Sequence, residues 1–221
     1  MKGSQTDWEA LEKMKDEDID LSEIPEVTAE QIAQATLRVG GKPVATNKAQ
    51  VRTAYNSDPE REWRRLEGGA QARLEYLITM HALHLHLPPP DQPYRLFDAG
   101  GGPGRYTLAL AAQGYAMTLL DLSPALLDLA RQHIAAAAPA LQQHIDAVHE
   151  GSITDLSRFP DQVFDGVLCL GGPLSHLLGP DDRQRALREL RRVARPGAPL
   201  FNFGHEPPRR LSLRGPVAGL F

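Results

Sequence analysis

The chain has 221 residues, of which 42% are hydrophobic and 24% charged, and its formal net charge is −4, so one globular domain with an appendage is expected. No run approaches the roughly eighteen consecutive apolar residues that cross a bilayer, and the acidic start MKGSQTDWEALEKMKDEDID is unlike a signal peptide. We therefore expect a cytoplasmic protein with no membrane contact. The single cysteine, Cys169, excludes a disulfide framework and a thiolate metal cluster.

Residues 1–48 differ from the rest of the chain in charge. They carry ten acidic and six basic side chains, including all five lysines, whereas residues 49–221 carry eighteen of each sign. Because the segment has few large apolar residues, it cannot bury enough surface to offset the entropy of ordering, and we expect it to be largely extended or disordered. The glycine-rich VGGKPVATN of residues 39–47 marks a boundary to a second domain over residues 49–221.

A helical cap is predicted over residues 55–90. Asp58 can cap a helix and Pro59 suits its first turn. Gly68 and Gly69 are expected to split the cap into two helices, and the prolines of residues 88–90 to end it. Apolar and aromatic positions recur at three- and four-residue steps along the second helix: Leu74, Leu77, Ile78, His81 and Leu85.

Residues 94–203 alternate short apolar runs with helical periods. The expected strands are YRLFDAG, AMTLLD, DAVHEG, FDGVLCLG and APLFNF, and the clearest helices are SPALLDLARQHIAAAA, with Ser123 as its cap, and DDRQRALRELRRVA. Such alternation predicts βαβ units and a parallel sheet, which is an α/β fold.

A glycine-rich loop follows the first of these strands. The strand ends at Asp98, and Gly100, Gly101, Gly102 and Gly104 precede the next helix. Ligands of open α/β sheets bind at this carboxyl edge, where the loop lets them approach the main chain and the helix offers free N–H groups. The pattern therefore predicts a polar, nucleotide-like ligand.

The spacing separates the ligand classes that use such a loop. A P-loop would need Lys and Ser or Thr after its last glycine, but Arg105 and Tyr106 stand there, so that class is excluded. The dinucleotide fingerprint fits Gly100 and Gly102 but requires a small residue where Arg105 stands, which disfavours a nicotinamide enzyme. Asp121, nineteen residues after Gly102, could accept the ribose hydroxyls of any nucleoside.

Residues 98–104 fit the pattern D-x-G-x-G-x-G, and together with LLDLSP (119–124) they resemble the class I S-adenosylmethionine-dependent methyltransferases. Residues 150–177, 192–200 and 55–66 are similar to one bacterial branch of that family. The resemblance covers roughly residues 50–203 and implies a Rossmann-like sheet, S-adenosylmethionine as cofactor and methyl transfer to a small-molecule acceptor.

The resemblance also implies a set of cofactor-binding residues. They are Asp98, Gly100, Gly102 and Gly104 at the methionine end, Asp121 at the ribose, Ser152, Ile153 and Asp155 at the adenine, Leu170 with Gly171 along the methionine, and Tyr55 as a lid. Many relatives have an acid where Ser152 stands, so adenine recognition is expected to depend on Asp155 or to be weaker.

Three sets of side chains have both a chemical and a structural interpretation. His176, after the fourth strand, is the candidate proton acceptor near the transferred methyl, and the alternative is a ring that packs or bonds the loop. His81, His84 and His86 lack a carboxylate or cysteine at ligand spacing, so no metal site is expected. The nine arginines between residues 183 and 214 are interpreted as a solvated face rather than a nucleic-acid surface, since several end a helix.

The chain departs from the family pattern at its carboxyl end. The family sheet has seven strands with a terminal hairpin, whereas five strands are visible here, followed by a proline- and glycine-rich tail over residues 204–221. We therefore expect a fold truncated after the fifth strand, an irregular tail, and self-association through the uncovered residues Leu200, Phe201 and Phe203. A catalytically impaired, cofactor-binding or partner-binding remnant is the alternative to an active enzyme.

The amino-terminal segment has a resemblance of its own. Residues 7–44 are similar to the stretch that precedes the DNA-binding part of BrnA-type ribbon-helix-helix antitoxins. Since the ribbon-helix-helix part itself has no counterpart here, the resemblance implies neither DNA binding nor toxin neutralisation.

Overall fold

The computed structural model describes residues 38–39, 42–43, 48–90, 92–177, 179–202 and 209–211. The chain divides into two compact units, Met1–Val44 and Ala45–Phe221. In the first unit, β1 (Arg38–Val39) and β2 (Lys42–Pro43) pair as an antiparallel ladder. Most of the predictions made for residues 1–48 lie outside the described residues.

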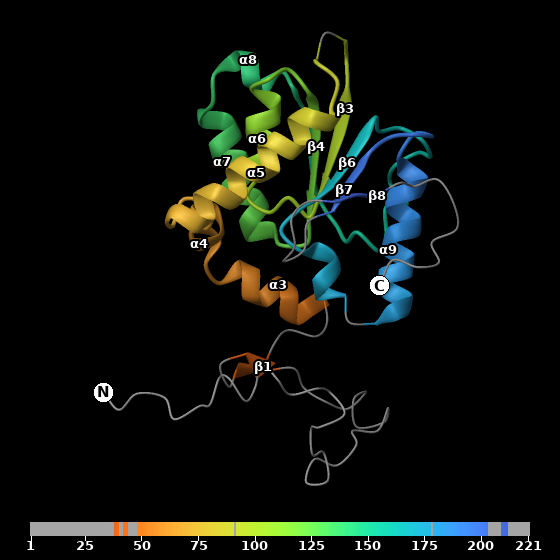
Figure 1. Cartoon of the computed structure of the whole chain (residues 1–221). Helices are drawn as coiled ribbons and strands as arrows, with labels where there is room; N and C mark the ends of the chain where they lie inside the picture. The colour runs from red at the N-terminus through yellow and green to blue at the C-terminus, as the bar shows by residue number, and fades with distance from the viewer. Residues whose placement is uncertain are drawn as a thin grey trace, which may run out of the picture. The chain divides into compact units, whose positions relative to one another are not determined.

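The second unit is built on a six-stranded sheet with the order β5-β4-β3-β6-β7-β8 (Figure 1). Its strands are β3 (Arg95–Ala99), β4 (Ala116–Asp121), β5 (Ile145–Glu150), β6 (Gly166–Cys169), β7 (Leu200–Asn202) and β8 (Arg209–Leu211). The first five run parallel to their neighbours, which confirms the five predicted strands and the Rossmann-like fold.

The sixth strand corrects the expectation of an uncovered edge. β8 pairs antiparallel with β7, and Leu200, Phe201 and Asn202 lie opposite Leu211, Arg210 and Arg209. The backbone of β7 is therefore paired on both sides, and residues 209–211 of the expected irregular tail form a strand. The prediction of self-association through β7 assumed an unpaired edge, and this strand does not have one.

Helices cover both faces of this sheet (Figure 1). They are α3 (Lys48–Asn56), α4 (Pro59–Arg64), α5 (Ala70–His86), α6 (Arg105–Ala111), α7 (Pro124–Ala136), α8 (Pro139–Gln142) and α9 (Pro180–Val193), with a 3-10 turn η2 (Pro173–His176). Two predicted caps are confirmed, because Asp58 Oδ1 accepts from Arg61 N at 3.1 Å and Ser123 Oγ accepts from Leu126 N at 3.2 Å. Among the described residues, no helix has the length and apolar content to cross a bilayer.

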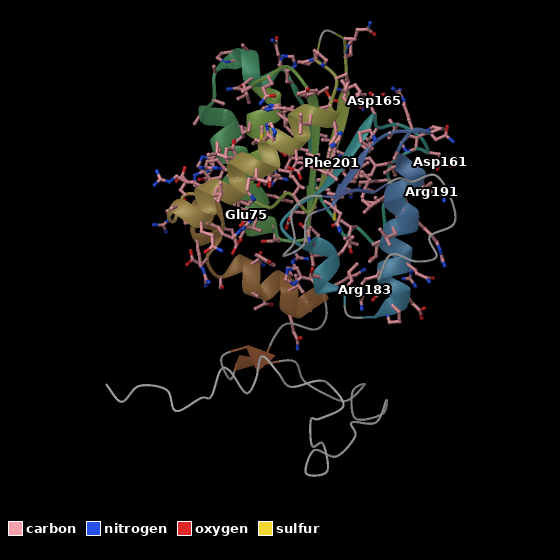
Figure 2. All side chains as sticks on the ribbon, in the orientation of Figure 1. Glu75, Asp161, Asp165, Arg183, Arg191 and Phe201 are labelled. Carbon is pink, nitrogen blue, oxygen red and sulfur yellow. The ribbon has the colours of Figure 1, made fainter. Side chains whose placement is uncertain are left out.

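The core has two layers because successive side chains of a strand point to opposite faces. On β3, Leu96 packs with Met80 and Leu83 of α5, whereas Phe97 packs with Leu190 of α9. Phe201 of β7, labelled in Figure 2, is buried in the α5 layer. Burial on both faces is the usual environment of a parallel sheet.

Helix α5 forms where it was predicted, but the recurring apolar positions do not face the core. Leu74, Leu77, Ile78 and Leu85 are 44–66% exposed, while Thr79, Met80 and Leu83 are buried. The contact with the sheet uses a different stripe of the same helix, because apolar residues occupy both sides of α5 and periodicity alone did not distinguish them.

A matched pair of leucine substitutions tests this orientation. We expect Leu83→Ala to lower the free energy of unfolding by about 2–5 kcal/mol, because it opens a cavity in the core. Leu77→Ala removes the same atoms from an exposed position and should change stability by less than about 0.5 kcal/mol. Urea denaturation of both variants measures the difference, and equal losses would show that α5 is rotated from this orientation.

Candidate functional site

A cavity of about 380 Å³ lies at the carboxyl ends of β3, β4 and β6. The glycine loop after β3 forms one wall, residues 151–153 after β5 form another, and α3 with η2 lies across from them. The structure therefore brings the predicted ligand loop to the edge of the sheet where open α/β folds bind ligands.

The glycine loop needs both the flexibility and the small size of its residues. Gly100 has φ +83°, in the left-handed region, and a Cβ there would lie 2.5 Å from Pro173 Cγ. Its N–H donates to the carbonyl of Leu120 at 2.7 Å, which joins the loop to the end of β4. Gly102 and Gly104 are also left-handed, with φ +58° and +81°. The main chain can thus come close to a ligand while the loop contacts η2.

Asp98 is the least satisfied polar group of the site. It is fully buried, and Thr107 Oγ1 of α6 donates to its Oδ2 at 2.6 Å, while its Oδ1 has no hydrogen-bond partner among the described residues. Burial raises the pKa of Asp98 to about 6. A buried carboxylate oxygen without a donor, in the wall of a cavity, is suited to a cationic donor on a ligand.

Asp121 has a structural role, because it accepts hydrogen bonds from the protein backbone. Its Oδ2 accepts from Gly102 N at 2.9 Å and its Oδ1 from Ser123 N at 2.8 Å, so it holds the glycine loop to the start of α7. Burial raises the pKa of Asp121. Because each carboxylate oxygen can accept more than one hydrogen bond, Asp121 can also receive hydroxyl groups from the cavity that it lines.

The loop after β5 contributes some of its predicted residues and not others. Ser152 and the buried Ile153 line the cavity, and the Ser152 hydroxyl lies 2.9 Å from that of Thr154. Asp155 is not among the lining residues. Its exposed carboxylate accepts from Ser157 N at 3.2 Å, and hydrogen bonds from Ser157 lower its pKa. The structure therefore places Asp155 in a turn, outside the cavity.

Arg192 of α9 holds this loop in place. Its guanidinium donates to the carbonyls of Phe159 and Leu156 at 2.9 and 2.8 Å, and to Asp161 at 2.7 Å. Glu189, one turn earlier on α9, accepts from Arg192 and from Leu156 N. Figure 2 labels Asp161 near the end of α9. This arginine was predicted only as a solvated helix-end cation, and the structure gives it a positioning contact.

Tyr55 and His176 meet across the cavity. Tyr55 Oη lies 2.8 Å from His176 Nε2, and their rings pack edge to face with centroids 5.4 Å apart. Burial raises the pKa of Tyr55 and lowers that of His176. Leu170, at the end of β6, is buried and lines the same space. Two candidates that lie 121 residues apart in the sequence therefore form one contact.

Five charged side chains of the cavity wall were missed by the sequence analysis: Lys48, Arg52, Glu62, Arg65 and Asp182. Arg52 pairs with Glu150 at the end of β5 at 2.8 Å, which ties α3 to the sheet. These residues belong to charged, helix-forming stretches that resemble solvated surface. No spacing rule could connect them with a loop that lies more than thirty residues away.

Arg65 is the most informative of these residues. Its Nη1 donates to Glu75 Oε1 at 3.1 Å, and its Nη2 would lie 3.3 Å from a Cβ on Gly171. Figure 2 labels Glu75 on α5. Nη2 donates no hydrogen bond within the described ranges, so this end of the guanidinium is available beside the loop that follows β6.

The described ranges contain no group of three or more histidine, cysteine or acidic side chains that could hold a metal ion. His84 of α5 instead bonds Gln113 Oε1 through Nε2 at 2.8 Å.

The sequence and structural comparisons point to one kind of domain. Residues 96–197 match the family model described as a methyltransferase domain. The ubiquinone/menaquinone biosynthesis C-methyltransferase UbiE of Rhodopseudomonas palustris is 30% identical over 120 residues, which are 52% of this chain and 43% of that protein. The malonyl-[acyl-carrier protein] O-methyltransferase of Serratia marcescens is 33% identical over 125 residues, 56% of this chain and 40% of that one. The chain thus spans less than half the length of these relatives.

Two solved structures share the fold. A Methanococcus maripaludis protein assigned to the S-adenosyl-L-methionine-dependent methyltransferases has TM-score 0.53 and 20% identity, covering 76% of this chain and 68% of its own. The cyclase SpnF has TM-score 0.56 and 23% identity, covering 72% and 60%. At these identities the likeness shows the fold alone. Residues 96–197 are thus similar to methyltransferase domains, and the second unit of the chain has a Rossmann-like fold that is also found in S-adenosylmethionine-dependent methyltransferases.

Proposed function

We propose that the chain binds S-adenosylmethionine in the cavity at residues 98–104 and transfers its methyl group to a small-molecule acceptor. One observation carries the proposal: Asp98 Oδ1 is buried in the cavity wall without a donor among the described residues, against a loop in which a Cβ at Gly100 or Gly101 would collide with its neighbours. The cofactor has a primary ammonium group that can supply this donor. The chemistry it brings is a sulfonium-bound methyl that nucleophiles attack directly.

The described residues provide complementary groups for the other parts of the cofactor. Arg65 Nη2, beside Gly171, can receive the methionine carboxylate, and Asp121 can accept the ribose hydroxyls. Gly151, Ser152 and Ile153 offer main chain and an apolar side chain to the adenine. Holding donor and acceptor together is expected to supply much of the rate, since methyl transfer needs proximity and alignment.

The relatives do not fix the acceptor. One is a C-methyltransferase of quinone biosynthesis and another an O-methyltransferase of a carrier-bound malonyl group, and each matches only about half of this chain. A small acceptor is proposed because the remaining wall, around Tyr55 and His176, belongs to the same cavity of about 380 Å³.

Ligand-dependent melting tests the cofactor. S-adenosylmethionine and S-adenosylhomocysteine should raise the melting temperature of the purified chain, because a ligand at a hundred times its Kd adds about 2.7 kcal/mol of stability. NAD should have no effect, since Arg105 stands where the dinucleotide site requires a small residue. A shift with NAD and none with the two sulfur nucleosides would contradict the proposal.

A pair of neighbouring arginines tests the methionine end. Arg65→Gln should weaken S-adenosylhomocysteine binding by about 1.5–3 kcal/mol, the range for a hydrogen bond to a charged group. Arg64→Gln is the control, because Arg64 contacts the Glu60 carbonyl on an exposed face and does not line the cavity. Calorimetric titration of both variants decides, and equal affinities would show that Arg65 does not contact the ligand.

A further inference from the structure

The Tyr55–His176 contact lies in the cavity wall, close to the glycine loop. α3 supplies Tyr55 and η2 supplies His176, and both side chains line the space that the cofactor would share with an acceptor. η2 begins at Pro173, which lies against Gly100 so closely that a Cβ on that glycine would collide with it. His176 is therefore one short turn away from the loop proposed to hold the methionine end.

The two ring nitrogens of His176 have different surroundings. Nε2 lies 2.8 Å from Tyr55 Oη, whereas Nδ1 has no hydrogen-bond partner among the described residues and is not among their buried unpaired atoms. Nδ1 is thus accessible on a side chain that lines the cavity. A ring nitrogen becomes a base when the other nitrogen carries the proton and is held by an acceptor.

The charged groups around the pair favour a neutral imidazole in the resting site. Burial lowers the pKa of His176 and outweighs the opposing effect of the Glu62 carboxylate. Glu62, Asp121 and Arg65 also act on Tyr55, whose phenol stays protonated because burial and the two carboxylates raise its pKa. At neutral pH the contact therefore joins a neutral imidazole and a neutral phenol.

We propose that His176 Nδ1 is the proton acceptor of the reaction, that Tyr55 positions the ring by accepting a hydrogen bond from Nε2–H, and that the methyl acceptor is a weakly acidic hydroxyl compound, a phenol or an enol. The inference rests on the proposed function, because it places the acceptor beside the same cofactor. Tyr55 is a positioning residue, since it acts through His176.

The reaction balances with these groups alone. As the acceptor oxygen forms its bond to the methyl carbon, its proton moves to His176 Nδ1 and the electron pair of the broken carbon–sulfur bond stays on sulfur. The positive charge passes from the sulfonium to the imidazolium, which Tyr55 Oη and Glu62 stabilise. A phenol or enol needs this base because its neutral oxygen is a poor nucleophile, whereas an acceptor without an acidic proton would not use it.

Nitrogen NMR of the full chain tests the pair without cofactor or acceptor. In uniformly ¹⁵N-labelled protein, the His176 signals, assigned by their loss in His176→Gln, should show a protonated Nε2 and an unprotonated Nδ1 at pH 8. Tyr55→Phe should give a mixture of tautomers, and the control Tyr76→Phe, which leaves the cavity wall intact, should not. A proton on Nδ1 in the wild type would overturn the assignment.

Methyl transfer to a series of phenols tests the acceptor class. With labelled S-adenosylmethionine at pH 8, His176→Gln should slow transfer to phenol about 10²–10⁴-fold, the usual contribution of a general base. The loss should be much smaller for 4-nitrophenol, which is already ionised. Tyr55→Phe should lower kcat with KM little changed, and the exposed control His81→Gln should match the wild type.

The outcomes separate this inference from the proposed function. Binding of S-adenosylhomocysteine without transfer to any phenol, or an equal loss across the series, would overturn the acceptor class and leave the cofactor site standing. Absence of S-adenosylhomocysteine binding would refute the proposed function, and the tautomer measurement would still judge the Tyr55–His176 pair.

Discussion

The site depends on a buried carboxylate with one unsatisfied oxygen. Asp98 lies near the end of the central strand β3, where it is fully buried and, among the described residues, is hydrogen-bonded by Thr107 alone. Burying such a group without full hydrogen bonding is unfavourable, and the protein tolerates it where a ligand can complete the set. The glycines that follow let the loop lie directly against this carboxylate and against η2, because side chains at Gly100 or Gly101 would collide with Pro173 or with Asp98 itself.

The remaining wall of the cavity is attached to this centre by a few long-range contacts. Asn56 accepts a hydrogen bond from Ser123 Oγ at 2.6 Å, and Arg52 pairs with Glu150, so α3 is fixed at the ends of β4 and β5. Arg105 stacks over Trp63 at 4.5 Å and bonds Glu67, which joins α4 and its following turn to the start of α6. Arg105, which disfavours a dinucleotide site, thus connects the helical cap to α6.

The sequence predicted the centre of the site better than its periphery. The strand, the glycine loop and Asp121 follow one another within about two dozen residues, so local spacing locates them. The outer part of the cavity wall forms only when α3, α4 and η2 fold together. This step brings Arg65 and Glu62 to the cavity and makes the Tyr55–His176 contact. The same limit explains β8, because a three-residue strand in a proline-rich stretch has no periodic signal, and its pairing with β7 is a tertiary event. Asp155 was predicted from the family pattern, but its turn directs it to Ser157.

The most direct test of the account is the pKa of the Asp98 carboxyl group, followed by ¹³C NMR in the free protein and in the presence of saturating S-adenosylhomocysteine. In the free protein, burial raises this pKa to about 6. If the ligand ammonium approaches Oδ1, the charged form is stabilised and the pKa should fall by about 1–3 units. An unchanged or higher pKa in a protein that has bound the ligand would contradict the placement of the cofactor on Asp98.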